Sequence, residues 1–370
     1  MIKKKVAVIT MHCPLNYGAV LQTYALQTFI ESLGHSVEII DYRPDYIVED
    51  QAYTYIANQQ FKKNIIYKLI YVVGKFPSKF KRKKVFNNFY KRKLNLSSHT
   101  YKTYNDLLLG TIEADTYICG SDQIWSYTNG GFKDEAYFLG FAPKDKKRIS
   151  YAPSGSFPNP LPHEMRKKLI SLLQNLDTIS VREGTTIPLL APLTDKEITE
   201  VLDPVFLVSL DTWRKQLSPI DKLNSCSFIL AYPIGDEELV LTCAQKLSKE
   251  TKLPVICISA SQRVDSRVDI QLTPKPEEFL YLFSQAAYIV TNSFHGTAFS
   301  IIFKKQFWSC VTAIANNRIL SLLEKTGLNN HLITSESKIS KNIIIDYNEV
   351  ETMLNRWIQT SQSYLKNCLK

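Results

Sequence analysis

The fold is defined by the stretch AYIVTNSFHGTAFSIIF, residues 287–303. Its β-branched and aromatic residues up to Thr291 predict a buried strand, and its apolar residues from position 298 onward predict a helix. Asn292 and Ser293 between them are of the types that favour the start of a helix. A strand, a short polar turn and a helix in this order are typical of a parallel α/β sheet, in which ligands bind at the carboxyl ends of the strands.

The turn within this stretch has the features of an anion-binding site. Gly296 lets the backbone come close to a ligand, and the start of a helix presents N–H groups and the positive end of the helix dipole. His295 lies in the same turn, and a histidine side chain donates or accepts a proton near neutral pH. A lone turn histidine is more often structural than functional, so the rest of the chain must decide its role.

Length and composition indicate a large globular protein. A chain of 370 residues is longer than one hydrophobic core usually serves, so two domains are expected. Hydrophobic residues make up 45% of the chain, and the seven cysteines contain no C-x-x-C pair, so we expect neither a disulfide framework nor a metal site. The first residues do not resemble a signal peptide and no apolar run is long enough to span a membrane, which predicts a cytoplasmic protein.

One segment carries the entire net charge of +10. Twelve of the 45 Lys and Arg residues lie between Phe61 and Lys93, where there is no acidic residue, and the other 33 are matched by 35 acidic residues. Aromatic residues such as Phe76, Phe80 and Tyr90 are interspersed with these charges. The segment predicts a peripheral contact with an anionic membrane at its inner face; the alternative is a solvated helical face with a few core aromatic residues.

The first half of the chain alternates between strand and helix patterns. Residues 4–11 and 37–40 predict strands, and residues 20–33 carry a helical apolar face between them, so the chain opens as a parallel sheet. Residues 45–98 interrupt this order as a basic helical insertion, which we expect to break at Gly74 and Pro77. Further strands are predicted at residues 115–119, 148–152, 178–181 and 198–202.

Polar residues follow most of these strands, and the carboxyl ends of parallel strands meet at one edge of a sheet. We therefore expect one cleft to be lined by Asn16, Ser121, Asp122, Ser154, Arg182 and Asp203. Because Arg182 is followed by Glu183, a structural ion pair is an equally good interpretation of this arginine. The loop after the first strand lacks the G-x-G-x-x-G pattern of a dinucleotide site.

A second alternation of strands and helices begins near residue 225. Strands are predicted at residues 228–232, 253–259, 287–291 and 307–311, and helices at 237–250, 277–285, 318–325 and 348–369. The predicted fold is α/β, with two Rossmann-like domains that face each other across a cleft. Their predicted bounds are 1–211 for the N-terminal domain, 212–225 for a linker, 226–345 for the C-terminal domain and 346–370 for a closing helix.

Six motifs occur in the order found in bacterial polysaccharide pyruvyl transferases. They are NYGAVLQ at 16–22, GSDQIW at 120–125, RISYA at 148–152, SVRE at 180–183, LDP at 202–204 and TNSFHG at 291–296. The resemblance implies a GT-B-like fold and transfer of a pyruvyl group from phosphoenolpyruvate onto a sugar as a cyclic ketal. The sugar would belong to a capsular or other surface polysaccharide, or to its lipid-diphosphate-linked precursor, with phosphoenolpyruvate as donor substrate and no cofactor or metal.

The resemblance also implies roles for particular residues, with the C-terminal domain on the donor side and the N-terminal domain on the acceptor side. The expected catalytic residues are His295, Arg182 and Asp122. The residues expected to bind the donor are Arg182, Asn292, Ser293, His295, Gly296, Thr297 and Arg318. The residues expected to bind the acceptor are Asn16, Tyr17, Gly18, Ser121, Asp122, Gln123 and Ser154.

Two site assignments stay open, and the first of them is open because of a departure from the family. Some members carry an arginine two residues before the histidine, where this chain has Ser293. The cation that binds the donor phosphate is therefore open among Arg182, Lys304 and Arg318. The carboxylate that stabilises an oxocarbenium-like carbon is open among Asp122, Glu183 and Asp203.

Two other functions compete with this interpretation. A nucleotide-sugar glycosyltransferase could use the same two-domain fold, but no distinctive acidic partner for a ribose follows residues 287–303. A nucleic-acid binder could use the basic residues 61–93, but no nucleic-acid-binding motif accompanies them, so nucleic acid is not an expected partner.

Overall fold

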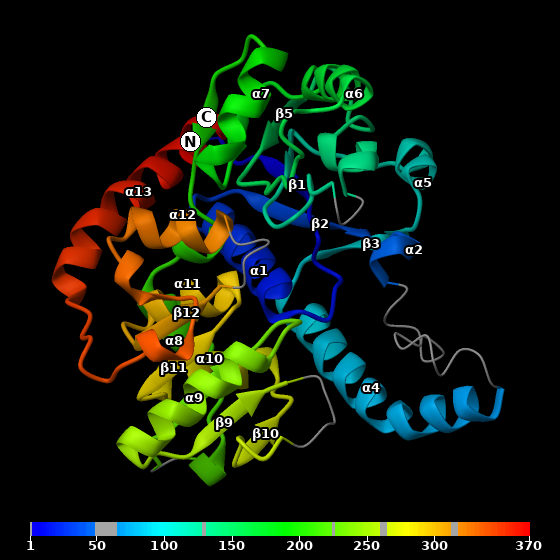
Figure 1. The fold of residues 1–370 in the computed structure, drawn as a ribbon. Coiled ribbons are helices and arrows are strands. Elements are labelled where there is room, and N and C mark those ends of the chain that lie inside the picture. The colour runs from blue at the N-terminus through cyan, green and yellow to red at the C-terminus, as the bar shows by residue number, and fades with distance from the viewer. Residues whose placement is uncertain (1, 49–64, 128–130, 224–225, 260–264, 312–316) are drawn as a thin grey trace. The chain divides into compact units, whose positions relative to one another are not determined.

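A computed structural model describes residues 2–48, 65–127, 131–223, 226–259, 265–311 and 317–370. The chain forms two compact units: unit 1 comprises Met1–Leu207 with Ser361–Lys370, and unit 2 comprises Val208–Thr360 (Figure 1). Part of the predicted insertion (residues 49–64, with Lys62 and Lys63) and two residues of the predicted linker (224–225) lie outside the described residues. The rest of that linker contains the end of the short helix α8 (Leu210–Arg214), which belongs to unit 2.

Unit 1 is built on a parallel sheet of five strands in the order β3-β2-β1-β4-β5. Strands β6 and β7 form a parallel pair, and a bridge between Ile149 and Thr178 places β6 beside β5. The carboxyl ends of these strands therefore share one edge, as the sequence predicts. The strands are β1 (Lys5–Ile9), β2 (Ser36–Tyr42), β3 (Leu96–Tyr101), β4 (Thr116–Cys119), β5 (Lys147–Ser150), β6 (Ile179–Val181) and β7 (Ile198–Glu200).

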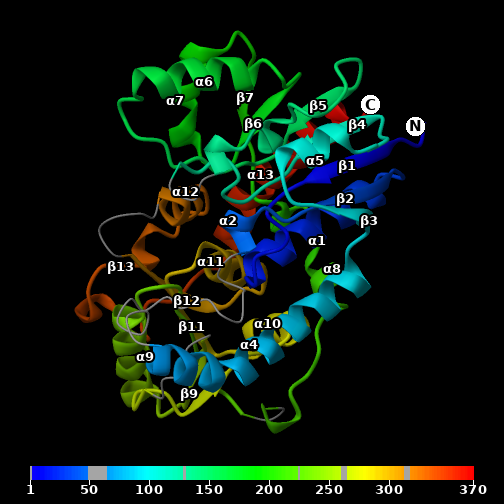
Figure 2. The ribbon, with the colours of Figure 1, turned by 90° about the vertical axis from the view of Figure 1, so that its right-hand side faces the viewer.

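Helices cover both faces of this sheet (Figure 2). Ile9 belongs to a buried cluster that includes Leu107 of α5 and helix α6. Val8 points to the other face, where α1 packs so closely that a Cβ added at Gly120 would lie 2.9 Å from Leu26 Cδ2. The helices of unit 1 are α1 (Tyr17–Ser32), α2 (Asp45–Val48), α4 (Ile65–Lys93), α5 (Tyr104–Leu109), α6 (His163–Leu173) and α7 (Ile187–Leu190).

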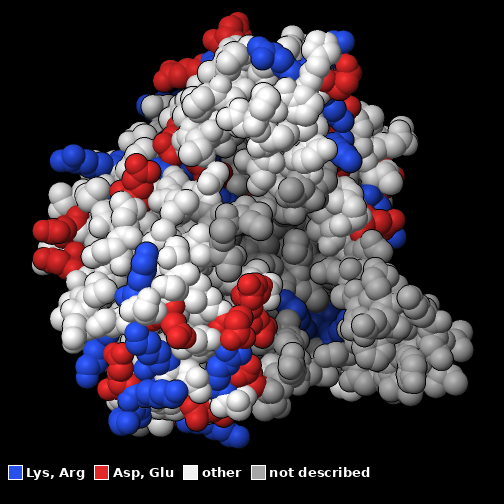
Figure 3. Space-filling model, viewed as in Figure 1, with Lys and Arg blue, Asp and Glu red and all other residues white. Residues whose placement is uncertain are grey.

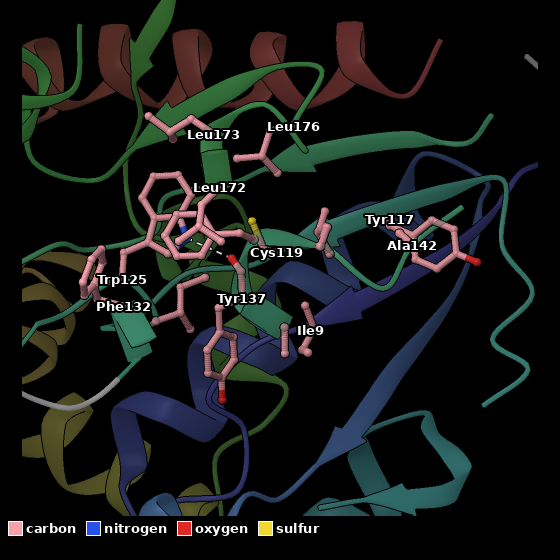
Figure 4. Close-up of a cluster of buried hydrophobic side chains, with 14 of the residues drawn as sticks. Ile9, Tyr117, Cys119, Trp125, Phe132, Tyr137, Ala142, Leu172, Leu173 and Leu176 are labelled. Carbon is pink, nitrogen blue, oxygen red and sulfur yellow. Dashed lines mark hydrogen bonds between the residues drawn. The ribbon is translucent and has the colours of Figure 1, made fainter. Parts of the chain in front are cut away.

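Aromatic residues fill the core of unit 1 on the side of α5 and α6. The rings of Trp125 and Phe138 stack with their centroids 4.9 Å apart, and Trp125 Nε1 donates a hydrogen bond to the carbonyl oxygen of Tyr137 at 2.9 Å (Figure 4). Burying an indole ring is favourable when its N–H finds a partner, as it does here. The core thereby fixes the segment 120–125 immediately after β4, which carries one of the six motifs.

Two expectations for the insertion are wrong. The helix α4 does not break at Gly74 or Pro77 but continues through both, and Figure 1 shows it bent along its length. A proline removes one intrahelical hydrogen bond, which bends a helix without ending it when the flanking turns are stable. Residues 96–98 are not part of the insertion but begin β3, an edge strand whose exposed polar residues give no apolar pattern.

Unit 2 contains a parallel sheet of six strands in the order β10-β9-β8-β11-β12-β13. The predicted strands and helices of this half are confirmed; the edge strands β10 and β13 were not predicted. The strands are β8 (Ile229–Tyr232), β9 (Val255–Ile258), β10 (Ile270–Leu272), β11 (Tyr288–Thr291), β12 (Gln306–Cys310) and β13 (Leu332–Ile333). The helices are α9 (Glu238–Thr251), α10 (Pro276–Gln285), α11 (Phe294–Ile302), α12 (Asn317–Lys325) and α13 (Tyr347–Cys368), which continues into unit 1.

The two faces of the unit 2 sheet are covered by different helices. Val290 and Trp308 lie in a buried cluster with residues of α9. On the other face Tyr232 packs edge-on against Phe279 of α10 at 5.1 Å, and Phe279 packs against Phe299 of α11 at 5.9 Å. Helix α11 is thus held against the sheet by aromatic contacts.

The surface of unit 2 carries charges of both signs. In Figure 3, Lys and Arg side chains alternate with Asp and Glu side chains over the lower left of the view, where Figure 1 places α9, β9 and β10. This agrees with the near balance of charge outside residues 61–93. Within the described residues, no helix is both long enough and apolar enough to cross a bilayer.

A buried group of hydrogen bonds around Asp41 joins the end of β1 to β2. His12 Nε2 lies 2.8 Å from Asp41 Oδ1, and Thr100 Oγ1 of β3 donates to Asp41 Oδ2 at 2.7 Å. Arg43 Nε donates to Asp41 Oδ1 at 2.6 Å. Burial works to raise the pKa of Asp41, but the hydrogen bonds from His12 and Thr100 and the positive charges of His12 and Arg43 outweigh it and lower the pKa.

We predict that Asp41 contributes to acid denaturation. Its carboxyl binds a proton less readily in the folded protein than in the unfolded chain, so its contribution is complete above the unfolded pKa of about 3.9 and is lost as pH falls below it. Asp41→Asn should lower the unfolding free energy at pH 7 by about 1–3 kcal/mol and flatten its decline between pH 5 and 3. Urea unfolding followed by circular dichroism measures both effects. The control is Asp145→Asn, which changes an exposed carboxylate. The prediction would be contradicted if the unfolding free energy declined equally with falling pH in the parent and both variants.

Candidate active site

Arg182 joins three strand ends at the carboxyl edge of unit 1. Its Nε donates to Glu183 Oε1 at 2.8 Å, and its Nη1 donates to Asp203 Oδ2 at 2.7 Å. Ser121 Oγ donates to the same Asp203 oxygen at 3.0 Å. All four side chains are buried, and they follow β4, β6 and β7. The structure therefore brings together three of the residues that the sequence placed at one edge.

The charges around Arg182 favour a structural role. Burial works to lower its pKa, but the carboxylates of Glu183, Asp203 and Asp122 outweigh burial and raise the pKa. Two carboxylates already contact one guanidinium, so the immediate surroundings are net negative and do not attract an anionic ligand. These contacts support the ion-pair interpretation, while donor binding by Arg182 stays a prediction.

The ends of β4 and β5 have strained backbones. Asp122 has φ = 72° and Ala152 has φ = 52°, both in the left-handed region that costs a residue with a side chain roughly 1–2 kcal/mol. Ser154 N donates to the carbonyl oxygen of Asp122 at 2.7 Å, and Arg182 N donates to that of Pro153 at 3.2 Å. Asp122 is only partly buried, unlike Glu183 and Asp203. The backbone thus holds an accessible carboxylate at this edge, and such strain clusters at functional sites.

The first motif is tied to this network by a chain of hydroxyl and amide groups. Asn16 caps α1, and its Oδ1 accepts from Gly18 N at 2.8 Å and Ala19 N at 3.3 Å. Gln22 Nε2 donates to Thr10 Oγ1 at 3.0 Å, and Thr10 Oγ1 donates to the carbonyl oxygen of Ser121 at 3.0 Å.

The other residues expected to bind the acceptor differ in exposure. Tyr17 is buried against Phe86, with their ring centroids 5.1 Å apart. Ser154 is buried, whereas Gln123 keeps exposed surface. Thr10, which sequence reasoning missed, was detectable as a polar residue directly after an apolar strand.

The turn between β11 and α11 in unit 2 is built from small hydroxyl residues. Ser293 caps α11, and its Oγ accepts from Gly296 N at 3.2 Å. Thr297 Oγ1 donates to Ser293 O at 3.1 Å and lies 2.7 Å from Ser309 Oγ, near the carboxyl end of β12. Thr291 Oγ1 accepts from Ser293 N at 3.0 Å. The turn is therefore fixed from both neighbouring strands, and His295 lies buried in its first helical turn.

The packing around position 296 explains why glycine is needed there, which the sequence did not indicate. A Cβ at this position would lie 2.4 Å from Thr291 Oγ1 and 3.0 Å from Tyr232 Cδ1. Real Cβ contacts are not that short, so glycine is needed for α11 to pack directly against β11 and β8. This close packing sets the position of the helix start, and with it that of His295.

Asn292 holds a neighbouring loop in place. Its Oδ1 accepts from Ile234 N at 2.6 Å, and its Nδ2 donates to Ile234 O at 3.0 Å and to Asp236 O at 2.8 Å. The loop after β8 is thus held beside the start of α11. Asn292 shapes this edge of the sheet through its amide group, which is engaged on both its oxygen and its nitrogen.

The two candidate cations of unit 2 lie at different ends of the sheet. Lys304 follows the C-terminal end of α11, and its Nζ forms an ion pair with Glu351 Oε1 at 2.5 Å. Arg318 is in the first turn of α12, which follows the carboxyl end of β12. Because β11 and β12 are parallel neighbours, Arg318 is at the same edge as the turn that holds His295, whereas Lys304 is at the opposite end of α11.

We predict that Arg182→Ala lowers the unfolding free energy by about 3–5 kcal/mol, because it leaves two buried carboxylates without their cation. The unfolding free energy of Arg182→Lys should lie between those of the parent and the alanine variant, because a lysine restores the charge but not both hydrogen bonds. Urea unfolding measures this. The control Lys167→Ala removes a cation from an exposed ion pair with Glu164 and should change stability by less than about 1 kcal/mol. An Arg182→Ala variant of parental stability that had lost donor binding would instead establish the donor role.

Several solved structures share this fold at low sequence identity. UDP-N-acetylglucosamine 2-epimerase gives a TM-score of 0.54 at 14% identity, covering 100% of this chain and 96% of the other. The Methanocaldococcus jannaschii UDP-GlcNAc 2-epimerase gives 0.51 at 12% identity, covering 98% of each chain. The Neisseria meningitidis enzyme bound to UDP-GlcNAc gives 0.50 at 10% identity, covering 99% of each. These likenesses establish the GT-B-like α/β fold that the sequence predicts.

Sequence comparison identifies the family. Among curated proteins, none matches the chain at a significant level. The family model for polysaccharide pyruvyl transferase, however, matches residues 16–312. That range contains all six motifs, the Arg182 network and the turn with His295. The chain therefore belongs to the polysaccharide pyruvyl transferase family.

Proposed function

We propose that this transferase moves the pyruvyl group of phosphoenolpyruvate onto two hydroxyls of one sugar in a bacterial surface or capsular polysaccharide, or in its lipid-linked precursor. The observation that carries the proposal is the family match over residues 16–312. The arrangement of residues at the carboxyl edges of the two sheets supports it, because a turn with a histidine and an accessible carboxylate supply the groups that ketal formation needs.

The reaction sets specific demands on the protein. Two sugar oxygens form bonds to C2 of phosphoenolpyruvate, the bond from C2 to the phosphate oxygen breaks, and the C3 methylene becomes a methyl group. One hydroxyl proton is balanced by the proton gained at C3, and the other leaves with the phosphate. The protein must therefore deliver and remove protons, bind a carboxylate and a phosphate, and stabilise positive charge at C2 in the transition state.

Unit 2 supplies the proposed donor site. The start of the nine-residue helix α11 offers its dipole to the donor anion, with Ser293, Gly296 and Thr297 shaping the turn. His295 would deliver the proton to C3, and Arg318 at the same edge would bind the phosphate. Asn292 would act indirectly, by holding the loop at Ile234 beside this turn.

Unit 1 supplies the proposed acceptor site. Among the three candidate carboxylates, Glu183 and Asp203 are buried and contact Arg182, whereas Asp122 keeps exposed surface. Asp122 is therefore the proposed group that stabilises positive charge or accepts a hydroxyl proton. Arg182 and Ser121 would hold this edge in place through Asp203, and Gln123 would contact the sugar.

The test is phosphate release from phosphoenolpyruvate in the presence of galactose-, mannose- and glucose-containing glycans. The parent should release phosphate with an acceptor, and His295→Ala should lower turnover by at least about 100-fold, because a general acid–base residue contributes ~10²–10⁴-fold. The control His163→Ala replaces an exposed histidine at the start of α6 and should keep parental turnover. Thermal melts verify that both variants fold. Turnover of folded His295→Ala within a few-fold of the parent would reject the role of His295.

The alternative function is nucleotide-sugar glycosyl transfer, which the UDP-sugar ligands named for structures of the same fold favour. Ligand binding to the folded state alone raises stability by ~2.7 kcal/mol at a hundredfold excess over Kd. We predict that thermal melts shift upward with phosphoenolpyruvate, less with inorganic phosphate, and hardly with uridine or guanosine diphosphate. The reverse ranking would support the glycosyltransferase and assign the α11 turn to diphosphate binding.

A further inference from the structure

Helix α4 is anchored to unit 1 by its C-terminal half. Phe86, Phe89 and Tyr90 are buried. The Phe89 ring packs edge-on against Tyr24 of α1 at 6.1 Å, and Tyr90 Oη donates to the carbonyl oxygen of Pro14 at 3.0 Å. These contacts fix the orientation of the C-terminal half of the helix on unit 1.

An exposed side of the helix carries two aromatic rings followed by lysines, which we call the outer stripe: Phe76, Phe80, Lys84 and Lys91. Phe76 and Phe80 are 45% and 48% exposed and stack with their centroids 6.0 Å apart. Lys84 and Lys91 are exposed as well. At about 100° per residue the four side chains fall within an arc of roughly 80°. Apolar rings and cations therefore share one side of the helix.

The charge around the outer stripe is of one sign. The sequence has no Asp or Glu between residues 51 and 105, so the whole of α4 and its flanking segments are without acidic residues. Lys81 and Arg92 add further positive charge to the exposed surface of the helix. A surface of this kind is complementary to an extended negative surface rather than to one isolated anion.

We infer that the outer stripe docks on the surface of an anionic lipid bilayer. A bilayer accepts both parts of the stripe at once: rings enter the boundary between headgroups and acyl chains, and lysines reach the lipid phosphates. Single-stranded nucleic acid is bound through ring faces on which bases stack, and Phe76 and Phe80 already occupy one face of each other, with an angle of 21° between their planes. The inference does not depend on the proposed function, since it concerns binding alone.

The test is sedimentation of the full chain with vesicles of phosphatidylcholine alone or with phosphatidylglycerol, at low and moderate salt. The parent should bind the anionic vesicles and bind the neutral ones far less. Its binding to the anionic vesicles should weaken as salt increases. Lys84→Glu with Lys91→Glu should weaken binding at least about 25-fold, since each lysine near anionic lipid contributes about fivefold. Phe76→Ser with Phe80→Ser should weaken it at least about fivefold at moderate salt, where the apolar contact matters most.

The matched control is Lys144→Glu with Lys249→Glu, which changes the net charge equally at exposed positions outside α4. It should bind like the parent apart from a small loss. Failure of the parent to bind anionic vesicles at low salt, or equal loss in the control and the stripe variants, would overturn the inference. Tighter binding to a single-stranded oligonucleotide than to the vesicles, lost in the Lys84 and Lys91 variant, would reassign the surface to nucleic acid. Because no donor or acceptor is present, each outcome is independent of the proposed activity.

Discussion

The buried guanidinium of Arg182 holds the carboxyl edge of unit 1 together. It contacts the carboxylates that follow β6 and β7 at 2.8 and 2.7 Å, and through Asp203 it reaches Ser121 after β4. Removing charges from water costs several kcal/mol per ion, which close contacts offset only while every partner is present. Such a network therefore adds little net stability to the folded protein. Its main effect is to hold the strand ends, and Asp122 with them, in one arrangement.

Most of the fold could be predicted because strands inside a parallel sheet are covered on both faces. Ile229–Tyr232 and Thr116–Cys119 are buried along their whole length and appear in the sequence as short apolar runs. The strands that sequence reasoning missed, β3, β10 and β13, are at the edges of their sheets. One side of an edge strand lacks a neighbour, so polar and exposed residues are tolerated there. The local rule at Pro77 failed because the rest of a long helix stabilises the turns on either side.

Positions in the candidate site could be predicted better than their roles. The sequence shows that a polar residue follows a strand, but not whether its partner is a ligand or another part of the chain. Asn292 contacts a residue 58 positions away, and Ser121 contacts one 82 positions away. Gly296 likewise lies so close to Thr291 and Tyr232 that there is no room for a side chain at this position. The same residue types serve for binding a ligand and for holding the chain together, and only the three-dimensional contacts distinguish the two roles.

Several polar side chains at the carboxyl edges of the two sheets already stabilise the fold, which narrows the choice of candidates for catalysis. In unit 1, Glu183 and Asp203 balance Arg182, whereas Asp122 is partly exposed on a left-handed backbone. In unit 2, hydroxyl groups fix the turn that places His295 at the start of α11. Enzymes of the same fold at 10–14% identity show that the backbone arrangement does not determine the reaction. In the proposed function the chemistry is therefore assigned to particular side chains, a carboxylate in unit 1 and a histidine in unit 2, each held by its own hydrogen-bond network.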